Sequence, residues 1–370
     1  MIYFCICACM LLFSMTIQIA NLKKINMEQV DKCLFICFSM VLIIMAAIRD
    51  NVGLDYGSYL EGFEGLHNLA GSIWSGIRND NYFEPLYNLL NILAPTFRAV
   101  IIICTGLGVL TKVVFFGKTN TRLFCLFLYF CSVYLYYDMG IMRQGISISL
   151  VWFALRYVKE EKTGKFFLCI IIASLFHVTA ILAIPVYLLG DRQHKPVFYI
   201  GLLAIGLAVA FSSVFLTRMI IETGPSYIAH KVRAYTTYLY TENSIRSLLS
   251  TVFIRLILST VFWCSIKKIQ KKRVLVNGEW LYFNAFFISI IETVAMSSIY
   301  IIATRGTAAL YFCYIPLFSV AINDKVNSWY VRLFIYMISV TFVLNTFTNI
   351  LLHSNGGLYL PYKTFLWKER

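Results

Sequence analysis

The stretch MRQGISISLVWFALRY, residues 142–157, places Arg143 and Gln144 at the start of an apolar run that begins at Ile146. An ionisable side chain at the edge of hydrocarbon costs several kcal/mol, so such residues are usually paired, exposed to water or functional. The stretch therefore predicts a membrane protein with a chemical site.

The composition indicates a polytopic membrane protein. Hydrophobic residues make up 59% of the 370 residues and charged residues 14%, with a mean hydropathy of +0.74, which excludes a soluble domain of this length. The net charge of +14 would suggest nucleic acid in a soluble protein. Here Lys and Arg gather in short linkers between apolar runs and report topology instead, so we expect no nucleic-acid partner.

A membrane span needs about 20 apolar residues, and ten segments are candidates. They are Ile2–Ala20, Cys33–Ile48, Arg98–Gly117, Leu123–Tyr137, Ile141–Val158, Val197–Leu216, Leu248–Ile266, Glu279–Ile302, Gly306–Ile322 and Val331–Leu352. The first is expected to be retained, because its basic residues follow the apolar run, the reverse of a secretory signal. The sequence predicts an all-α, polytopic protein of about 10–12 transmembrane helices, with residues 1–370 forming a single transmembrane domain.

Basic residues in the linkers set the expected topology. They fall in six groups, at 23–32, 112–122, 156–165, 192–195, 267–273 and 325–332. If all six face the cytoplasm, every span alternates correctly except the segment 165–190, which must leave and return on the same side.

That segment, KFFLCIIIASLFHVTAILAIPVYLLG, carries His177 near its centre, and each half is too short to cross. Two short helices that meet at Phe176-His177 form a re-entrant hairpin, which is tolerated where protein or water covers the break. The alternative is a single span of 25 residues with the weak Arg192/Lys195 linker outside. With the hairpin, both termini face outward.

The outward side then collects the long hydrophilic segments. These are 49–97, 138–143, 217–246, the corner Thr304-Arg305 and the tail from His353. Because they hold most of the unpaired arginines and carboxylates, we expect the chemistry to be extracytoplasmic, with loops 49–97 and 217–246 forming part of the active-site cover.

The first candidate group begins where a span ends and an outward loop starts. It supplies a cation, carboxylates and stacking rings from Arg49, Asp50, Asp55, Tyr56 and Tyr59. Gly53 and Gly57 allow tight turns between them. The alternative is a capped helix end with a local Arg–Asp pair and interfacial tyrosines.

Two more groups follow along the chain. Glu84-Pro85 predicts an interfacial helix that begins at Pro85, with Glu84 as an acid or base. Arg143 and Gln144 stand at the outer end of a span, and guanidinium offers a permanently charged fork of donors suited to phosphate oxygens. The alternative is an Arg143–Asp138 pair that holds a helix corner.

The last groups lie deeper or later in the chain. His177, inside an apolar segment, is a candidate base, or only a hydrogen-bonded packing group. Arg233 and Tyr235 stand in the large outward loop. Arg305, with Tyr311 nearby, has long apolar flanks that place it near or within the membrane, as a functional cation or an anchor that reaches the interface.

Other chemistries lack their motifs. The sequence contains no phosphate-binding loop, G-x-S-x-G, H-E-x-x-H or dinucleotide fingerprint, and the cysteines show no metal-ligand spacing. We therefore expect neither a metal nor another cofactor.

Taken in order, several of these motifs resemble the EpsG-type family of Wzy-like bacterial polysaccharide polymerases. They are Arg49 with Gly53-Leu54-Asp55-Tyr56 and Tyr59, Glu84-Pro85 with Tyr87, Met142-Arg143-Gln144-Gly145, Ala173-Ser174-Leu175-Phe176-His177, Arg305 with Tyr311-Phe312, and Pro361-Tyr362-Lys363. The resemblance spans nearly the whole chain, and the ordered set is more specific than any one motif.

The resemblance implies a glycosyltransferase of GT-C-like architecture in the bacterial inner membrane. It would polymerise undecaprenyl-diphosphate-linked oligosaccharides on the outer face, in the route to O-antigen, capsule or exopolysaccharide. A Wzx-like flippase and a Wzz-like chain-length regulator would be its partners, beside membrane lipids. Carried over by position, Arg49, Asp55, Arg143, His177 and Arg305 would be functional.

Three other functions remain open. An O-antigen ligase would use the same donor but transfer to the lipid A core. A flippase or other transporter would favour internal repeats and a central charged path, neither of which the sequence displays. A membrane acyltransferase would need a carboxylate beside His177, which the local sequence lacks.

Overall fold

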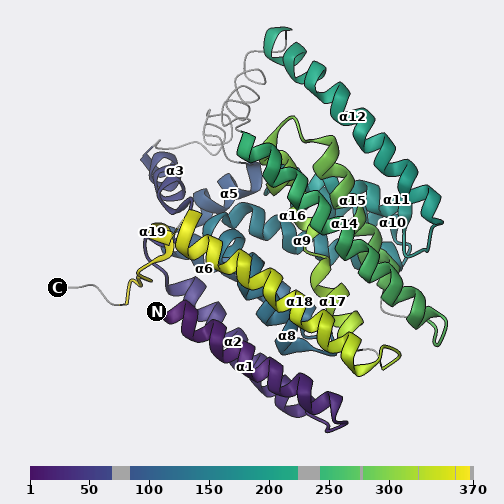
Figure 1. Cartoon of the computed structure of the whole chain (residues 1–370). Coiled ribbons are helices and arrows are strands. Elements are labelled where there is room, and N and C mark those ends of the chain that lie inside the picture. The colour runs from purple at the N-terminus through teal and green to yellow at the C-terminus, as the bar shows by residue number, and fades with distance from the viewer. Residues whose placement is uncertain (69–83, 224–241, 276–277, 324, 355, 367–370) are drawn as a thin grey trace. The chain divides into compact units, whose positions relative to one another are not determined.

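The computed structural model describes residues 1–68, 84–223, 242–275, 278–323, 325–354 and 356–366 (Figure 1). Within these ranges the chain is helical, and one isolated antiparallel β-bridge joins Arg49 and Thr364. The predicted all-α fold is confirmed.

The chain divides into two compact units. Unit 1 comprises Met1–Ala154, Leu168–Val178 and Phe318–Arg370, and unit 2 comprises Leu155–Phe167 and Thr179–Leu317. The helices, in chain order, are α1 (Ile2–Leu22), α2 (Glu28–Ile48), α3 (Tyr56–Asn68), α5 (Pro85–Leu93), α6 (Phe97–Thr105), η1 (Gly106–Leu110), α7 (Thr111–Phe116), α8 (Arg122–Tyr129), η2 (Phe130–Gly140), α9 (Met142–Lys159), α10 (Thr163–Ser174), η3 (Val178–Ala183), α11 (Ile184–Leu189), α12 (Pro196–Thr223), α14 (Glu242–Gln270), α15 (Glu279–Ala295), η4 (Ile302–Gly306), α16 (Ala308–Tyr311), α17 (Tyr314–Asn323), α18 (Trp329–Thr348), η5 (Asn349–Ser354) and α19 (Gly356–Tyr359). The expectation of a single membrane domain stays a prediction.

Among the described residues, seven helices are long and apolar enough to cross a membrane, or eight if one bent pair counts as a span. The seven are Ile2–Leu22, Glu28–Ile48, Phe97–Phe116, Arg122–Gly140, Pro196–Thr223, Arg246–Gln270 and Trp329–Leu352, and the pair, bent by 42°, is Ile302–Tyr311 with Tyr314–Asn323. The multi-pass character is confirmed, with fewer such helices than the 10–12 expected. The difference has a plain cause: α15 has 17 residues, and α9 carries three basic residues in 18.

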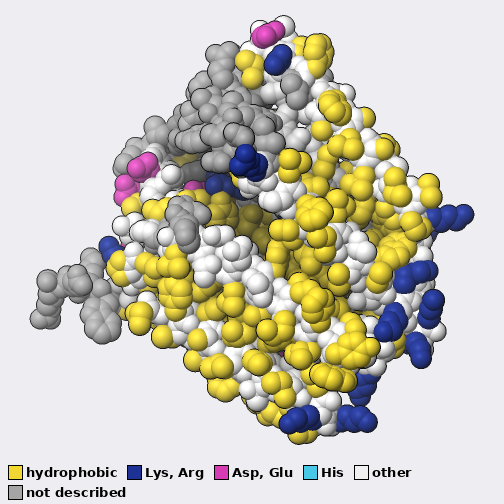
Figure 2. All heavy atoms as spheres, viewed as in Figure 1, with side chains coloured by type: hydrophobic (Ala, Val, Ile, Leu, Met, Phe, Trp, Pro, Cys, Tyr) yellow, Lys and Arg dark blue, Asp and Glu magenta, His cyan; other side chains and the backbone are white. Residues whose placement is uncertain are grey.

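Large apolar side chains cover the outsides of these helices. Figure 2 shows hydrophobic side chains spread over α18 and over α14. Phe334 on α18 and Phe253 on α14 are 63% and 64% exposed, and Phe211 on α12 is 81% exposed. Such surfaces would be costly in water and fit contact with lipid.

The helix formed by α8 and η2 is the core of unit 1. Its side chains are almost all buried, and it packs against α1, α2 and α18. Ser14 on α1 and Tyr336 on α18 join their hydroxyl groups at 2.8 Å beside it. The η2 part of this helix is wound as a π-helix, a wider helical form that is often found at functional sites.

In unit 2, α15 is the central helix. It packs against α11, α12, α14 and α16, and the rings of Tyr199, Trp263 and Phe283 meet at centroid distances of 5.4–5.5 Å. Asp191 accepts a hydrogen bond from the backbone amide of Leu281 at 2.9 Å, which satisfies a free donor at the start of α15.

The segment 165–190 forms the predicted hairpin. α10 ends at Ser174, the amide of His177 bonds back to Ala173, and the chain continues through η3 and α11. The ring of Tyr187, near the end of α11, lies 5.1 Å from that of Phe166, and its hydroxyl group hydrogen-bonds Thr163 at the start of α10. The two ends therefore meet, which contradicts the alternative of one continuous span.

Basic linkers gather within each unit, as their assignment to one side of the membrane requires. In unit 2, Arg192 lies 3.7 Å from Glu161, and Lys267 donates to Gln193 at 3.2 Å. These contacts bring the linkers at 156–165, 192–195 and 267–273 together. In unit 1, one pocket is lined by Lys24, Arg122, Lys325 and Arg332, which come from the linkers at 23–32, 112–122 and 325–332.

Candidate functional site

The candidate groups of unit 1 that the sequence assigns to the outward side lie at the end of α2 that is opposite those linkers. α2 has 21 residues, so its ends are about 30 Å apart, close to the thickness of a bilayer core. Arg49 follows its last residue and pairs with Thr364 in the β-bridge. The amide of Asp50 donates to the carbonyl of Lys363 at 3.1 Å. The C-terminal tail thus closes over the loop that the sequence singled out.

Arg49 is buried, with 1% of its surface exposed. One guanidinium nitrogen donates to the carbonyl of Ala46, while Nε and Nη2 have no hydrogen-bond partner among the described residues. The Asp50 carboxylate accepts a hydrogen bond from the Tyr56 hydroxyl at 2.9 Å, so the partner of Asp50 is Tyr56 and not Arg49. Because buried donors are normally satisfied, Arg49 retains capacity to bind a ligand.

Gly53 explains why this loop can approach η2 so closely. Its φ of +124° is a conformation that other residues rarely adopt, and a Cβ here would lie 2.2 Å from the carbonyl oxygen of Met139. The tight turn predicted at Gly53 is confirmed. Gly57, in contrast, lies in the first turn of α3 with open space around it.

Arg143 lies in what we call the Arg143 cage, formed by Glu84, Tyr59 and Tyr87. Its guanidinium pairs with the Glu84 carboxylate, and its central carbon lies 5.5 Å from the ring centre of Tyr59 and 5.9 Å from that of Tyr87. The side chains of Arg143 and Glu84 are 15% and 19% exposed. The cage therefore joins three candidate groups that are far apart in sequence.

Two helices form the walls of the cage: α3 carries Tyr59, and α5 carries Tyr87 and begins directly after Glu84. Glu84 directly precedes Pro85, the first residue of α5, which confirms the predicted helix start. Tyr59 and Tyr87 are fully buried and their rings lie 5.3 Å apart. Burial raises the pKa of Tyr59 to about 12, so this hydroxyl stays protonated at physiological pH and the charges of the cage belong to Arg143 and Glu84.

A buried ion pair supports the helix that carries Arg143. Lys112 on α7 donates from Nζ to Asp138 Oδ1 at 2.7 Å, to the carbonyl of Gly145 at 2.7 Å and to Ser149 at 2.8 Å, and Tyr129 donates to the other carboxylate oxygen at 2.7 Å. The alternative of an Arg143–Asp138 pair is therefore wrong. Assigning Lys112 to a basic linker is also wrong, because it is fully buried.

The glycine of Met142-Arg143-Gln144-Gly145 is explained by this pair. A Cβ on Gly145 would lie 2.8 Å from Asp138 Oδ1 and 2.8 Å from a backbone carbonyl oxygen, and a Cβ on Gly108 of η1 would meet the same carboxylate at 2.8 Å. Two glycines thus let α9 and η1 close around the carboxylate, which fixes the start of α9.

The other predicted residues of unit 1 lie around these groups. Gln144 is buried, and Asp55 and His177 are half-buried. The carbonyl of His177 accepts a hydrogen bond from Ser147 on α9 at 3.4 Å, and the neighbouring Phe176 belongs to the same apolar cluster as Tyr59 and Tyr87. The break of the hairpin is therefore packed against α9.

Arg305 and Tyr311 belong to unit 2. Arg305 lies in η4 and is half-buried. Tyr311 stacks under a cation that the sequence analysis missed: the guanidinium carbon of Arg255 lies 3.7 Å from its ring centre, and Arg255 donates to Thr293 at 2.7 Å. Arg233 and Tyr235 lie outside the described residues.

Sequence reasoning also missed Glu292 on α15. It is 7% exposed, and neither carboxylate oxygen has a hydrogen-bond partner among the described residues. The signal was present, because an acid inside an apolar run of this length is a functional candidate by default. Within the described ranges, no three His, Cys, Asp or Glu side chains gather as a metal site would require.

Comparison with known proteins places this chain in a family. Searches of curated proteins and of solved structures find no significant match. A family model described as "EpsG family" matches residues 32–364. This range is nearly the whole chain and includes Arg49, the Arg143 cage and the Lys112–Asp138 pair. The chain therefore belongs to the EpsG family.

Proposed function

We propose that this protein joins lipid-linked oligosaccharide repeat units into a longer polysaccharide at the outer side of the cytoplasmic membrane. Membership of the EpsG family supports a polysaccharide polymerase-type role. The observation that carries the finer assignment is the Arg143 cage, in which the guanidinium lies beside two buried rings and pairs with one carboxylate.

The cage suits a diphosphate next to a sugar. Guanidinium binds phosphate oxygens through two parallel N–H bonds, and a largely desolvated site strengthens that attraction. Glu84 holds Arg143 until substrate arrives, and the larger negative charge of a diphosphate can then compete for the same donors. The fully buried rings of Tyr59 and Tyr87 keep water away from one side of the guanidinium, which strengthens its attraction for a phosphate oxygen.

The reaction we propose is a glycosyl transfer. A hydroxyl oxygen of one lipid-linked repeat unit attacks the anomeric carbon of the growing glycan on undecaprenyl diphosphate. A C–O glycosidic bond forms, the bond from that carbon to the diphosphate breaks, and the hydroxyl proton passes to a base. Negative charge develops on the leaving diphosphate, so fixed cations lower the barrier. We assign Arg143 and Arg49 of unit 1 to this role. The same role for Arg305, which belongs to unit 2, stays a prediction from the sequence.

The proton needs an acceptor within reach of the sugar hydroxyl. Asp55 and His177 are our candidates. Asp55 directly precedes α3, the helix that carries Tyr59, and His177 follows Phe176 of the same apolar cluster. Gln144, Asp50 and Tyr56 are proposed to bind the glycan or its carrier. The binding roles expected for Tyr311, Arg233 and Tyr235 stay predictions from the sequence. Wzx-like and Wzz-like proteins are the proposed partners.

The test is the length distribution of the glycan in cells that depend on this gene. Arg143→Ala and Arg143→Lys should both remove long chains and leave single repeat units, because Lys keeps the charge but loses the two-pronged fork. The matched control is Arg98→Ala, an exposed arginine of unit 1 stacked on Phe365, which should leave the ladder unchanged. Membrane content of each variant is measured by immunoblot.

Three outcomes separate the alternatives. Single repeat units on the final acceptor indicate a lost polymerase, whereas no glycan on that acceptor indicates a lost ligase. Repeat units trapped on the cytoplasmic side indicate a lost flippase. A normal ladder in Arg143→Ala at wild-type protein levels would remove Arg143 from the mechanism.

A further inference from the structure

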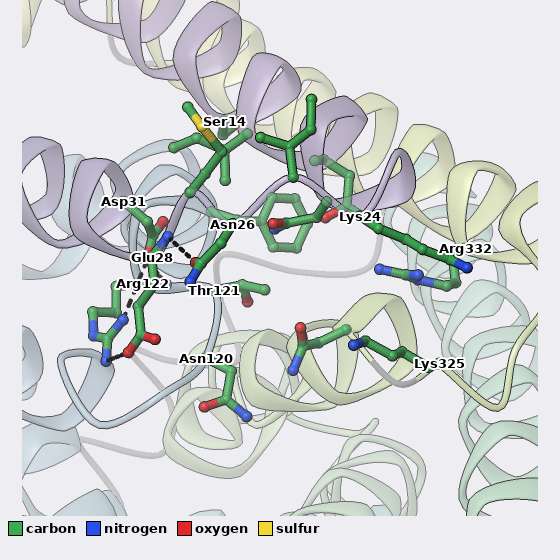
Figure 3. A pocket seen from close by; sticks show the side chains of 17 residues that line it. Ser14, Lys24, Asn26, Glu28, Asp31, Asn120, Thr121, Arg122, Lys325 and Arg332 are labelled. Carbon is green, nitrogen blue, oxygen red and sulfur yellow. Dashed lines mark hydrogen bonds and ion pairs between the residues drawn. The ribbon is translucent and has the colours of Figure 1, made fainter.

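The basic linkers of unit 1 enclose a pocket that the proposed reaction does not use. It is a cavity of about 520 Å³ at the α2 end opposite Arg49, lined from α1, α2, the start of α8, and the turn between α17 and α18 (Figure 3). This volume lies within the range of small-molecule sites, about 300–1,000 Å³.

Among the described residues that line it, four are basic and two are acidic: Lys24, Arg122, Lys325 and Arg332 against Glu28 and Asp31. The acids are already engaged. Arg122 lies 3.6 Å from both carboxylates, and Asp31 also accepts the backbone amides of Arg122 and Leu123 at 3.1 Å, which satisfies the start of α8.

Lys24, Lys325 and Arg332 are the other basic residues of the described lining. Figure 3 shows these three on one flank of the pocket and the Arg122–Glu28–Asp31 group on the other. Arg332 is 8% exposed, and its Nε donates to the carbonyl of Ile322 at 2.5 Å, so its position is fixed. The two lysines are exposed and reach the pocket from turns.

The rest of the lining mixes polar and apolar side chains. The side-chain amides of Asn21, Asn26 and Asn120 can bond hydroxyl groups, while Ile17 and Phe124 supply apolar surface. A ligand with a phosphate, a small polyol and an apolar part would match this lining.

We infer that this pocket binds a phosphate-bearing anion, and that the headgroup of an anionic phospholipid of the inner leaflet supplies it. The basic linkers assign this end of unit 1 to the cytoplasmic side, where anionic lipids attract clustered Lys and Arg. The inference does not depend on the catalytic proposal, because the pocket and the Arg143 cage lie at opposite ends of α2.

The experiment uses the purified full-length protein in detergent, titrated with phosphatidylglycerol, phosphatidylcholine, glycerol phosphate or inorganic phosphate, with bound molecules counted by native mass spectrometry. Lys24→Gln/Lys325→Gln is the test variant, since both side chains are exposed and their loss should not impair folding. Lys195→Gln/Lys271→Gln, two exposed lysines of unit 2, is the charge-matched control.

Wild type and control should bind phosphatidylglycerol in preference to phosphatidylcholine, and the test variant should bind it about 30-fold more weakly, as expected for two surface cations. The same loss for glycerol phosphate or inorganic phosphate, with no binding of phosphatidylglycerol, would leave the anion site standing and overturn its lipid source. Equal binding of every anion by the test and control variants would overturn the site itself.

Discussion

Replacing Lys112 with methionine tests the buried pair that supports Arg143. The substitution keeps much of the side-chain volume but removes the Nζ donors to Asp138, Gly145 and Ser149, which lie at 2.7–2.8 Å. Asp138 then keeps the bond from Tyr129 and loses its counter-charge in a fully buried position. Breaking such a pair by removing one partner typically costs about 3–5 kcal/mol.

That cost is a large part of the total stability of a typical domain, about 5–15 kcal/mol. Lys112→Met should therefore lower the folded yield and the thermal unfolding midpoint in detergent. Lys112→Met/Asp138→Asn removes both charges while keeping an acceptor for Tyr129, and it should recover most of the loss, because a buried pair is often no more stable than a neutral replacement.

The control is Lys118→Met, an exposed lysine beyond the end of α7, which should change the midpoint little. The reasoning is refuted if Lys112→Met unfolds at the wild-type temperature, or if the double variant is no more stable than the single one.

Three further predictions concern packing and protonation. Gly145→Ala should cost about 1–3 kcal/mol by overpacking against the Asp138 carboxylate, measured as a lower unfolding midpoint. Gly53→Ala should abolish folding, because φ at this position is +124° and the new Cβ would lie 2.2 Å from a carbonyl oxygen of η2. Gly57→Ala should be tolerated, because open space surrounds Gly57. Equal stability of the two variants would contradict the loop geometry. Burial raises the pKa of Tyr59 from 10.0 to about 12, so the folded state holds a proton that the unfolded chain releases near pH 10. The free energy of unfolding should therefore fall as pH rises from 10 to 12. Tyr59→Phe should show a shallower fall, and an unchanged slope would contradict this role of Tyr59.

Much of the fold could be predicted because a bilayer constrains it so strongly. Apolar segments of span length became long helices, and the side preference of basic linkers was enough to predict the hairpin at 165–190, whose ends meet at Thr163 and Tyr187. Pro85 marked a helix start for a local reason, its fixed φ and missing N–H. Fewer described helices meet the length and composition of a span than the sequence predicts, because α15 has 17 residues and α9 carries three basic residues.

The site was predicted in its residues more than in its pairings. Arg143 and Glu84 were both candidates, yet Arg143 was paired with Asp138, five residues away, as the local alternative. The actual partners come from distant segments: Glu84 is 59 residues from Arg143, and Lys112 is 26 residues from Asp138. Lys112 resembled a linker charge because it stands near the end of an apolar run. Only the tertiary structure shows that Gly108 and Gly145 leave room for the carboxylate of Asp138, the partner of Lys112.

The most direct test of the central claim is synthesis by the purified protein. Wild-type protein, reconstituted in nanodiscs and supplied with an undecaprenyl-diphosphate-linked repeat unit from its host, should produce glycans of two or more repeats and release one undecaprenyl diphosphate for each bond formed. The Arg143→Lys variant should be incorporated into nanodiscs as well as the wild type, and it should form neither the longer glycan nor free undecaprenyl diphosphate. Unchanged substrate with folded wild-type protein, or equal product from Arg143→Lys, would contradict the account.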